Sequence, residues 1–528
     1  LISPPYGGGR APVLAKNAVA SSQPLATQAG IEALHNGGNA VDAALATAIT
    51  LTVVEPTMNG LGGDGFALIW DGKKLHGMNA SGRAPAAWTP DYFSGKAAMD
   101  LIGWNTVTVP GMVSGWIALS RKFGKLPFAQ LFKRAIDYAE NGFPVSPVIA
   151  RQWREAVPIL KNQPGFSESF LVDGKAPTAG QIWRYPAQAK TLREIADTEG
   201  ESFYTGKLAQ SMVDFAQSTG GCFTMADFAN NQTEWVEPLA FDYGDYTLHE
   251  IPPNGSGIAA QIALGILQAA NVKQYPANSA QRIHLQIEAM RMAFADVYAY
   301  VSDARSMQMP VTSLLDRNYL ASRAAMIDHN KAGSYGAGDP HSGGTVYLCA
   351  ADESGMMISY IQSNFKGFGS GVVAPGGIAF HNRGMSFRLE DGHPNQVAPG
   401  KRPFHTILPA FLTKDGKPTM AFGVMGGNMQ PQGHIQFVMR FVDEYLNPQA
   451  CSDAPRWRID DVGMLTVEAS MPTAVVEGLK AMGHEVSVMP ANSLDFGSAQ
   501  AIALLGEETQ DAYIAGSDHR RDGLAAGF

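Results

Sequence analysis

A loop rich in glycine, serine and proline meets an apolar strand at residue 345, and this junction constrains the chain more than any other feature. The loop ends with the run Gly338-Asp339-Pro340-His341-Ser342-Gly343-Gly344. Residues 345–351 predict a strand, and residues 356–362 predict a second one after a short polar turn. The two segments are therefore expected to form a β-hairpin that begins at Thr345.

Thr345 would carry two reactive groups if the Gly344–Thr345 bond were cut. Its hydroxyl can serve as a nucleophile and the new α-amine as its base. An α-amine has a pKa of about 7.7–8.0, close to the value at which a general base works best at neutral pH. Gly343 and Gly344 have no side chains to obstruct attack of the hydroxyl on the Gly344 carbonyl. The junction predicts a self-cleaving amide-bond enzyme, and a threonine that merely starts a strand is the alternative.

A second glycine-rich turn, Gly423-Val424-Met425-Gly426-Gly427-Asn428, follows a strand predicted at 419–424 and precedes a helix predicted at 435–445. Consecutive glycines at such a turn allow two backbone N–H groups to point at one oxygen. Gly426 and Gly427 are therefore candidates for an oxyanion hole. An ordinary strand-to-helix turn is the alternative.

The first part of the chain reads mainly as helices, and the second part mixes strands with helices. A first helix is expected to end near His35, with Ser22 as its cap, and Asn39 is expected to cap a second helix. Residues 301–344 predict a weakly patterned connection. This distribution favours stacked sheets between helical layers. The other clear helices are expected at 116–123, 128–141, 187–197, 279–300 and 472–482.

Composition excludes several classes of protein. The net charge is −9 and no basic tract occurs, which argues against a nucleic-acid partner. Three distant cysteines without a C-x-x-C pair, and histidines without metal-ligand spacing, predict no metal and no disulfide scaffold.

The most apolar stretch, 43–54, is too short to span a bilayer. The chain start shows no leader, which favours a cytoplasmic location; a periplasmic one stays open because Met is missing.

Several motifs together resemble those of the γ-glutamyltranspeptidase family of N-terminal nucleophile hydrolases. The resemblance extends from about residue 18 to Phe528. It rests on 19–30, Gly37-Gly38-Asn39-Ala40-Val41-Asp42-Ala43-Ala44, Val54-Glu55-Pro56, the glycine loop 59–65, Val109-Pro110-Gly111, Lys401-Arg402-Pro403, Asp453-Ala454-Pro455-Arg456 and Ser517-Asp518-His519-Arg520.

This resemblance implies a four-layer αββα sandwich of mixed α/β (α+β) class. It also implies a cut into a large chain, 1–344, and a small chain, 345–528, which together form one domain. Thr345 would be the nucleophile, with Gly426 and Gly427 at the oxyanion hole and no metal or organic cofactor. Ser363 falls where the family has a threonine near the nucleophile.

The substrate pocket departs from the family pattern. The arginine that reads the γ-glutamyl carboxylate is replaced by Ser81, with Arg83 two residues on, and the acidic reader of the substrate amine falls at Ser386. Arg383 is a candidate cation for a substrate carboxylate, and an exposed arginine is the alternative. The family's paired serines fall at His405 and Thr406, and Asn364 is displaced by one residue from the family's pocket asparagine.

These departures favour a small carboxylate amide without the glutamyl amine, such as oxamate, whose acyl group passes to water or to an amine. The run Asn79-Ala80-Ser81-Gly82-Arg83-Ala84-Pro85 also resembles the oxamate amidohydrolase and β-lactam acylase branches. A γ-glutamyl amide such as glutathione, a glutaryl-type acyl amide, and an uncut, latent precursor are the alternatives. Assembly into a homo-oligomer stays open.

Replacement of Thr345 by alanine tests the self-cleavage. We expect Thr345→Ala to remain one polypeptide where the parent chain yields two, because the attacking hydroxyl is absent. Denaturing electrophoresis and intact mass measure the outcome. Thr345→Ala protein that still splits at this junction would exclude the proposed nucleophile.

Overall fold

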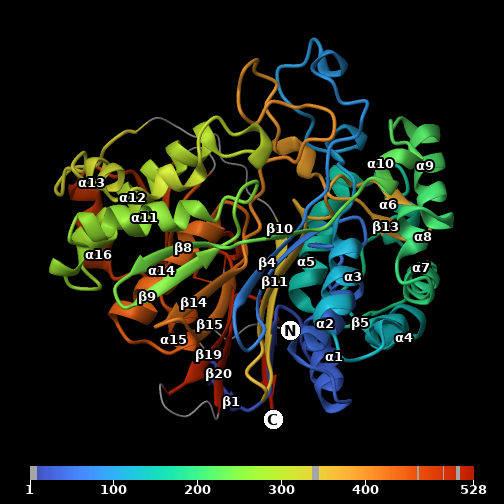
Figure 1. The fold of residues 1–528 in the computed structure, drawn as a ribbon, viewed down its shortest axis with the longest axis horizontal. Coiled ribbons are helices and arrows are strands. Elements are labelled where there is room, and N and C mark those ends of the chain that lie inside the picture. The colour runs from blue at the N-terminus through green and yellow to red at the C-terminus, as the bar shows by residue number, and fades with distance from the viewer. Residues whose placement is uncertain (1–8, 336–343, 461–462, 492, 507–511) are drawn as a thin grey trace.

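The computed structural model describes residues 9–335, 344–460, 463–491, 493–506 and 512–528, and it has two seven-stranded antiparallel sheets at its centre (Figure 1). The loop 336–343 before the predicted cleavage point, like residues 1–8, lies outside the described residues. The first sheet has the order β1 (Val13–Ala15), β20 (Ala512–Ser517), β19 (Ala499–Leu505), β15 (Lys417–Val424), β14 (Ala410–Lys414), β9 (Tyr246–Glu250), β8 (Leu239–Tyr243). The second has the order β21 (Leu524–Gly527), β2 (Ala18–Ser21), β10 (Gly344–Ala351), β11 (Met357–Phe365), β3 (Asp64–Trp70), β4 (Leu75–Ala80), β7 (Glu234–Val236).

The two sheets pack face to face, as the alternation along β10 demonstrates. Tyr347, Cys349 and Ala351 join an apolar core with residues of the first sheet such as Phe411 and Ile502. The alternate side chains of β10 point the other way, into a core shared with helices. Neighbouring side chains on a strand face opposite sides, and each side of β10 lies in one of these cores. β10 is therefore buried on both faces. The expected hairpin at Thr345 is confirmed by the β10–β11 pairing.

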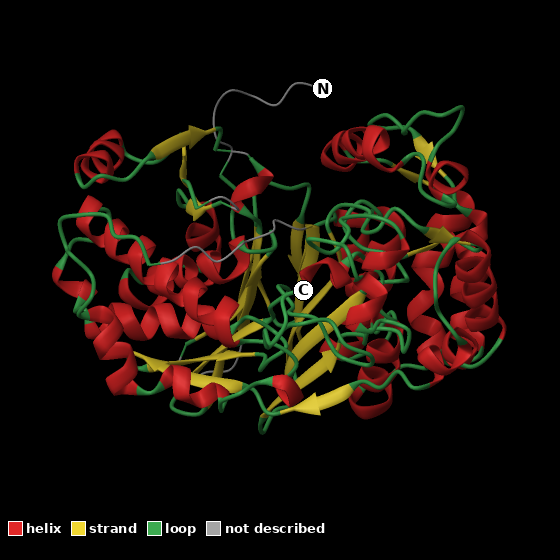
Figure 2. Ribbon diagram, turned by 90° about the horizontal axis from the view of Figure 1, so that it is seen from above, coloured by secondary structure: helices red, strands yellow, loops and turns green. Residues whose placement is uncertain are grey.

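Helices cover both outer faces, so the expected four-layer αββα sandwich is confirmed (Figures 1 and 2). The helices on the second sheet include α1 (Pro24–His35), α2 (Ala40–Val54), α3 (Met112–Phe123) and α4 (Lys133–Asn141). Those on the first sheet are α11 (Ile258–Ala269), α12 (Ala280–Tyr300), α14 (Met429–Asp443) and α16 (Thr473–Ala481). All 15 residues of α2 are buried, which explains its apolar character all round. No helix among the described residues is both long and apolar enough to cross a bilayer.

Shorter elements complete the chain. The remaining α-helices are α5 (Pro147–Leu160), α6 (Phe166–Phe170), α7 (Pro186–Asp197), α8 (Glu201–Tyr204), α9 (Lys207–Thr219), α10 (Met225–Ala229), α13 (Arg317–Ala324) and α15 (Pro448–Asp453). Small sheets are formed by β5 (Phe143–Pro144) and β6 (Ile182–Trp183), by β12 (Val373–Ala374) and β13 (Ile378–Ala379), and by β16 (Trp457–Ile459), β17 (Leu465–Glu468) and β18 (Val486–Met489). The 3₁₀ turns are η1 (Pro90–Phe93), η2 (Trp104–Thr106), η3 (Phe128–Phe132), η4 (Val272–Gln274), η5 (Ala304–Ser306), η6 (Val311–Leu315), η7 (Arg383–Ser386) and η8 (Leu494–Phe496).

The helix caps agree with the sequence in one case and differ in another. Asn39 caps α2 in a capping box with Asp42, as predicted. The predicted cap of α1 at Ser22 is wrong, because Gln23 takes that position and accepts from the N–H groups of Leu25 and Ala26. The Ser22 hydroxyl instead donates to the buried Glu55 carboxylate.

The predicted connection at 301–344 contains a helix. Asp316 caps α13, and its carboxylate accepts from the N–H groups of Asn318 and Tyr319. Polar residues on the exposed side of α13 hide its helical periodicity, while Leu320 and Ala324 are its buried residues.

The two parts of the chain on either side of residue 344 interleave in both sheets. β10 pairs with β2 from the first part and with β11 from the second, and β11 pairs with β3 from the first part. In the first sheet, β14 pairs with β9 in the same way. Backbone hydrogen bonds therefore join the two parts across both sheets.

A buried ion network fixes the C-terminal segment. Asp518 lies 2.8 Å from Arg456 and 3.2 Å from Arg520, and Glu468 of β17 lies 2.6 Å from Arg520. All four side chains are at most 1% exposed. Burial alone would raise the pKa of Asp518, but the two guanidinium groups and the Ala499 N–H outweigh it and hold the pKa well below its ordinary value.

Removal of the Asp518 charge should destabilise the fold. We expect Asp518→Asn to lower the free energy of unfolding by about 3–5 kcal/mol at pH 7, because two buried guanidinium groups lose a partner. Since the folded pKa is lowered, this contribution exists above the ordinary carboxyl pKa of 3.8 and disappears as the pH falls through and below it. Urea unfolding at several pH values measures it.

The pair Asp495–Arg458, whose aspartate is 51% exposed, provides the control. Asp495→Asn should change stability by less than about 1 kcal/mol. Equal effects of the two replacements would contradict the importance of the buried network.

Candidate active site

Thr345 lies at an irregularity in the β10–β11 ladder. Gly344 pairs with Phe365 and Val346 pairs with Gln362, so Ser363 and Asn364 together face Thr345. This is a β-bulge in β11, a device that re-aims side chains next to active sites. Thr345 is fully buried, and its Oγ1 lies 3.4 Å from the Ser363 Oγ. Phe365 adopts a φ of 75°, rare for a residue with a side chain.

Gln430, which the sequence analysis missed, contacts the same hydroxyl. Its Nε2 donates to Thr345 Oγ1 at 3.3 Å, and its Oε1 accepts from the Leu408 N–H at 2.8 Å. Gln430 belongs to the first turn of α14, which begins at Met429 and not near Ile435 as predicted. Its position three residues after Gly427 was the signal available in the sequence.

Gly426 and Gly427 form the turn from β15 into α14. Their φ values of 124° and 61° are ones that glycine adopts without strain. Their carbonyls accept from the N–H groups of Met429 and Gln430 at 3.1 and 3.0 Å, which starts the helix. The turn therefore places the positive N-terminal end of α14 next to the residue that contacts Thr345.

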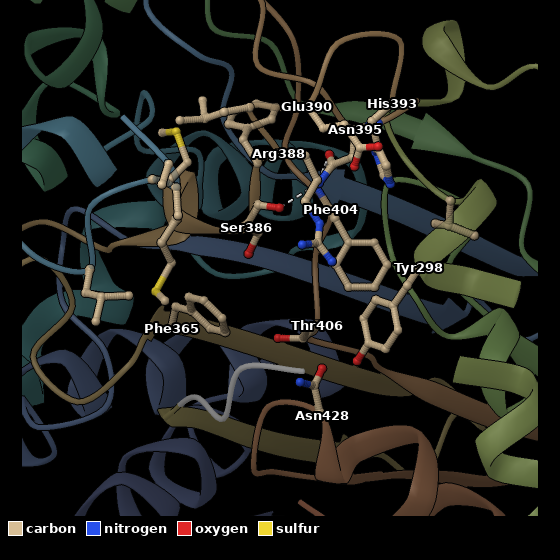
Figure 3. A pocket seen from close by; sticks show the side chains of 18 residues that line it. Tyr298, Phe365, Ser386, Arg388, Glu390, His393, Asn395, Phe404, Thr406 and Asn428 are labelled. Carbon is tan, nitrogen blue, oxygen red and sulfur yellow. Dashed lines mark hydrogen bonds between the residues drawn. The ribbon is translucent and has the colours of Figure 1, made fainter. Parts of the chain in front are cut away.

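A pocket of about 290 Å³ adjoins this group (Figure 3). Thr345 is not among its lining residues, but Phe365 and Asn428 are, and these follow Asn364 and Gly427 in the chain. Two predicted substrate-binding residues, Ser386 and Thr406, also line it. Its apolar wall includes Met99, Leu101, Met385, Phe387 and Phe404; its polar residues include Tyr298, Arg388, Glu390, His393 and Asn395.

Arg388 is a second residue that the sequence analysis missed. Figure 3 shows its side chain extending into the pocket beside Phe404. Its backbone is fixed, because its N–H donates to the Asn395 carbonyl at 3.0 Å and its own carbonyl accepts from Val397 at 2.9 Å. Arg388 lies only two residues after Ser386, so the run 383–388 was the available signal.

Arg383 is buried behind the pocket. It is 1% exposed, so the alternative of an exposed arginine is wrong. Its Nη1 donates to Thr406 Oγ1 at 3.0 Å, its guanidinium lies 3.7 Å from the centre of the Phe365 ring, and its buried Nη2 has no hydrogen-bond partner among the described residues. Burial lowers the pKa of Arg383 to about 9, although the Asp64 charge opposes this.

Asp64 is the carboxylate that faces this buried cation. One of its oxygens accepts from the N–H groups of Gly82 and Gly111 at 2.9 and 3.1 Å, and the other lies 3.1 Å from His405 Nε2. Burial raises the pKa of Asp64 to about 6. Burial, with the Arg383 charge, lowers the pKa of His405 well below its ordinary value. His405 is therefore neutral and donates to Asp64. It is buried and directly precedes Thr406 in the chain.

The remaining predicted residues divide into two groups. Asn364 lies in the bulge opposite Thr345, and neither polar atom of its buried amide has a partner among the described residues. Arg83 lies elsewhere: it pairs with Asp303 and Glu234 and lines a separate pocket. The structure thus gathers the bulge, the pocket and the buried charges around Thr345 but leaves Arg83 outside.

One group of described residues could hold a metal ion, and it contains none of the residues around Thr345. His284, Glu288 and His484 are buried with ligand atoms within 4.8 Å of one another. Several of their polar atoms already have partners: His284 Nδ1 lies 2.7 Å from His484 Nε2, and Glu288 accepts from Gly333 and Tyr335. His484 Nδ1 has no partner among the described residues. In the sequence, this group is indicated only by the spacing of His284 and Glu288, which lie one helical turn apart on α12.

Comparison with known proteins identifies the family. The sequence profile of the gamma-glutamyltranspeptidase family matches residues 26–528. The glutathione hydrolase-like YwrD proenzyme of Bacillus subtilis (strain 168) is 35% identical over 522 residues, which is 97% of this chain and 98% of that protein. The oxamate amidohydrolase proenzyme of Klebsiella pneumoniae is 36% identical over 518 residues, 96% of this chain and 97% of that protein.

Among solved structures, cephalosporin acylase from Bacillus halodurans has a TM-score of 0.94 and 43% sequence identity. The match covers 100% of this chain and 98% of that one. The chain therefore belongs to the gamma-glutamyltranspeptidase family and is an enzyme of its hydrolase and acyltransferase type.

Proposed function

We propose that this chain is a self-cleaving amidohydrolase in which Thr345 becomes the N-terminal nucleophile. The observation that carries the proposal is the burial of Thr345 in a β-bulge, with its hydroxyl contacted by Ser363 and Gln430 next to a pocket. The proenzyme names of the two curated relatives support a cut, which we place between Gly344 and Thr345.

Self-cleavage needs only the chain and water. Thr345 Oγ1 bonds to the Gly344 carbonyl carbon, the Gly344–Thr345 C–N bond breaks, and the Thr345 nitrogen takes up the proton that leaves Oγ1. Water then hydrolyses the resulting ester, which restores the hydroxyl and leaves Gly344 with a carboxylate. Thr345 now has a free α-amine next to its own hydroxyl.

The same two groups then act on the substrate amide. The α-amine takes the hydroxyl proton while Oγ1 bonds to the acyl carbon, and the carbonyl electron pair moves onto oxygen, where Gly426 and Gly427 donate. When that pair returns, the C–N bond breaks and the leaving amine receives the proton from the α-ammonium. Water, or an accepting amine, then removes the acyl group from Oγ1.

The pocket supports a substrate with both a carboxylate and an apolar body. Arg388 in the pocket and the buried Arg383 behind Thr406 supply positive charge. Phe365, Phe387 and Phe404 supply apolar surface. The volume of about 290 Å³ lies near the lower end for small-molecule sites. We therefore place a dicarboxylic monoamide of glutaryl type first, in line with the cephalosporin acylase likeness.

Oxamate is the second candidate. The relative named oxamate amidohydrolase favours it, as does the neutral Ser386 where the family has its acidic reader of the substrate amine. Oxamate has no carbon between its carboxylate and its amide, so it would leave the apolar wall of the pocket without contacts. A γ-glutamyl amide carries a charged amine that needs an acidic partner. Ser386 is neutral and does not supply that negative charge.

Replacement of Arg388 tests the carboxylate site. We expect Arg388→Gln to raise KM for a glutaryl anilide about 10- to 100-fold, because a charge-assisted hydrogen bond contributes roughly 1.5–3 kcal/mol. KM for the uncharged valeryl anilide, which has the same length, should change little. Steady-state kinetics on both substrates, with γ-glutamyl anilide and oxamate alongside, measure the effect.

Arg305→Gln serves as the matched control, because Arg305 lines the separate pocket and is largely exposed. It should leave both KM values unchanged. Equal loss on the charged and uncharged substrates, or clear preference of the parent enzyme for the γ-glutamyl anilide, would contradict the assignment.

A further inference from the structure

We infer that Gln430 is a catalytic residue that donates a hydrogen bond to the nucleophile in both self-cleavage and substrate turnover. The inference rests on the proposed role of Thr345. Its observation is independent of the pocket: Gln430 Nε2 lies 3.3 Å from Thr345 Oγ1, and both side chains are fully buried.

The direction of this hydrogen bond is fixed by the other end of the amide. Gln430 Oε1 accepts from the Leu408 N–H at 2.8 Å. If the amide were turned over, its NH₂ group would face the Leu408 N–H, and two donors would oppose each other in a buried place. Nε2 must therefore face Thr345, and a neutral amide nitrogen can only donate.

A donor on this side of Oγ1 excludes one direction for the hydroxyl proton. The proton cannot lie toward Gln430, so it is directed toward the other neighbours of Oγ1. One of these is the Ser363 oxygen at 3.4 Å, and after cleavage the second is the α-amine of Thr345 itself. Gln430 thus presents the hydroxyl to its base in the orientation that proton transfer requires.

The same donor stabilises the charge that develops on Oγ1. Hydrogen bonds to an ionised oxygen are stronger than those to a neutral hydroxyl. The hydrogen bond from Gln430 therefore strengthens as the proton leaves Oγ1. It stabilises the transition state more than the ground state, which lowers the barrier. The backbone anchor at Leu408 holds the amide in place beforehand, so little reorganisation is needed at the moment of reaction.

Leu408 also connects this donor to the pocket wall. It lies two residues after Thr406, which lines the pocket and accepts from Arg383. Gln430 therefore joins the nucleophile to the segment that would hold the substrate. A change in this amide should affect the chemical step more than substrate binding, because Gln430 is not among the lining residues.

Two variants separate donation from packing. Gln430→Met keeps the length of the side chain and removes the donor. Gln430→Glu keeps an acceptor for the Leu408 N–H and replaces the donor by an ionisable oxygen. The control is Gln436→Met, a buried glutamine on the same helix whose amide bonds to backbone carbonyls of Gln432 and Trp457. All are compared with the parent chain and with Thr345→Ala.

We expect Gln430→Met to slow both self-cleavage and kcat about 10- to 100-fold with KM within about twofold of the parent. Gln436→Met should leave these rates unchanged. The rate of cleavage at Gly344–Thr345 is followed by electrophoresis, and kcat and KM are measured on cleaved enzyme. Unchanged kcat in folded Gln430→Met, or a loss confined to KM, would overturn the inference.

The pH dependence of kcat in Gln430→Glu tests donation to Oγ1 even if Gln430→Met fails to fold. An ionised carboxylate cannot donate to Oγ1, but a protonated one can. The ratio of its kcat to that of the parent should therefore rise as the pH is lowered toward the carboxyl pKa. A ratio that is flat or rises with pH would overturn the inference.

These results are distinguishable from failure of the proposed function. If the parent chain is not cut before Thr345, or if Thr345→Ala is cut, then the nucleophile itself is wrongly assigned. If the parent is cut and Thr345→Ala is not, the Gln430 variants test the donor alone.

Discussion

The pairing of β10 between β2 and β11 is the constraint on which the site depends. This strand lies in the middle of the second sheet and is buried on both faces, so its register cannot shift without moving every side chain to the wrong side. Because Tyr347 and Cys349 point between the sheets, the alternation also directs Thr345 toward that gap, where α14 begins. The bulge at Ser363 and Asn364 then ends the regular ladder beside Thr345. The nucleophile is thus positioned by backbone pairing, which explains how a small hydroxyl side chain can be held without ionic contacts.

The charges of the site obey a different physical rule. Arg383 and Asp64 are both nearly inaccessible to water, and each has its pKa shifted by burial toward the neutral form. Such a pair is costly to bury and is tolerated only when hydrogen bonds satisfy its members. Asp64 has three such bonds, whereas one nitrogen of Arg383 has none among the described residues. The other end of this guanidinium, Nη1, donates to Thr406, which lines the pocket.

The sequence predicts local elements well and long-range contacts poorly, for reasons that particular residues make clear. The hairpin at Thr345 and the capping box at Asn39 depend on neighbours in the chain, and both are confirmed. The helix predicted from residue 435 begins at Met429, and Pro431 lies in its first turn. Proline is tolerated in a first helical turn, where its missing N–H has no partner to lose. That error concealed Gln430, whose contacts with Thr345 and Leu408 join residues 85 and 22 positions apart. For Arg388, the nearby Ser386 indicates the segment but not the direction in which the arginine side chain points.

The separation of these two parts of the site has a consequence for specificity. The nucleophile, the bulge and the turn at Gly426 belong to strands and to a helix start, which are rigid and shared by the whole αββα frame. Ser386, Arg388 and Thr406 belong instead to the irregular segment between β13 and β14, which tolerates substitution because few ladder hydrogen bonds depend on it. Relatives named as a glutathione hydrolase-like protein, an oxamate amidohydrolase and a cephalosporin acylase all match this one chain along nearly its full length. A common frame with different substrates is what this arrangement predicts if, as we propose, that segment selects the acyl group.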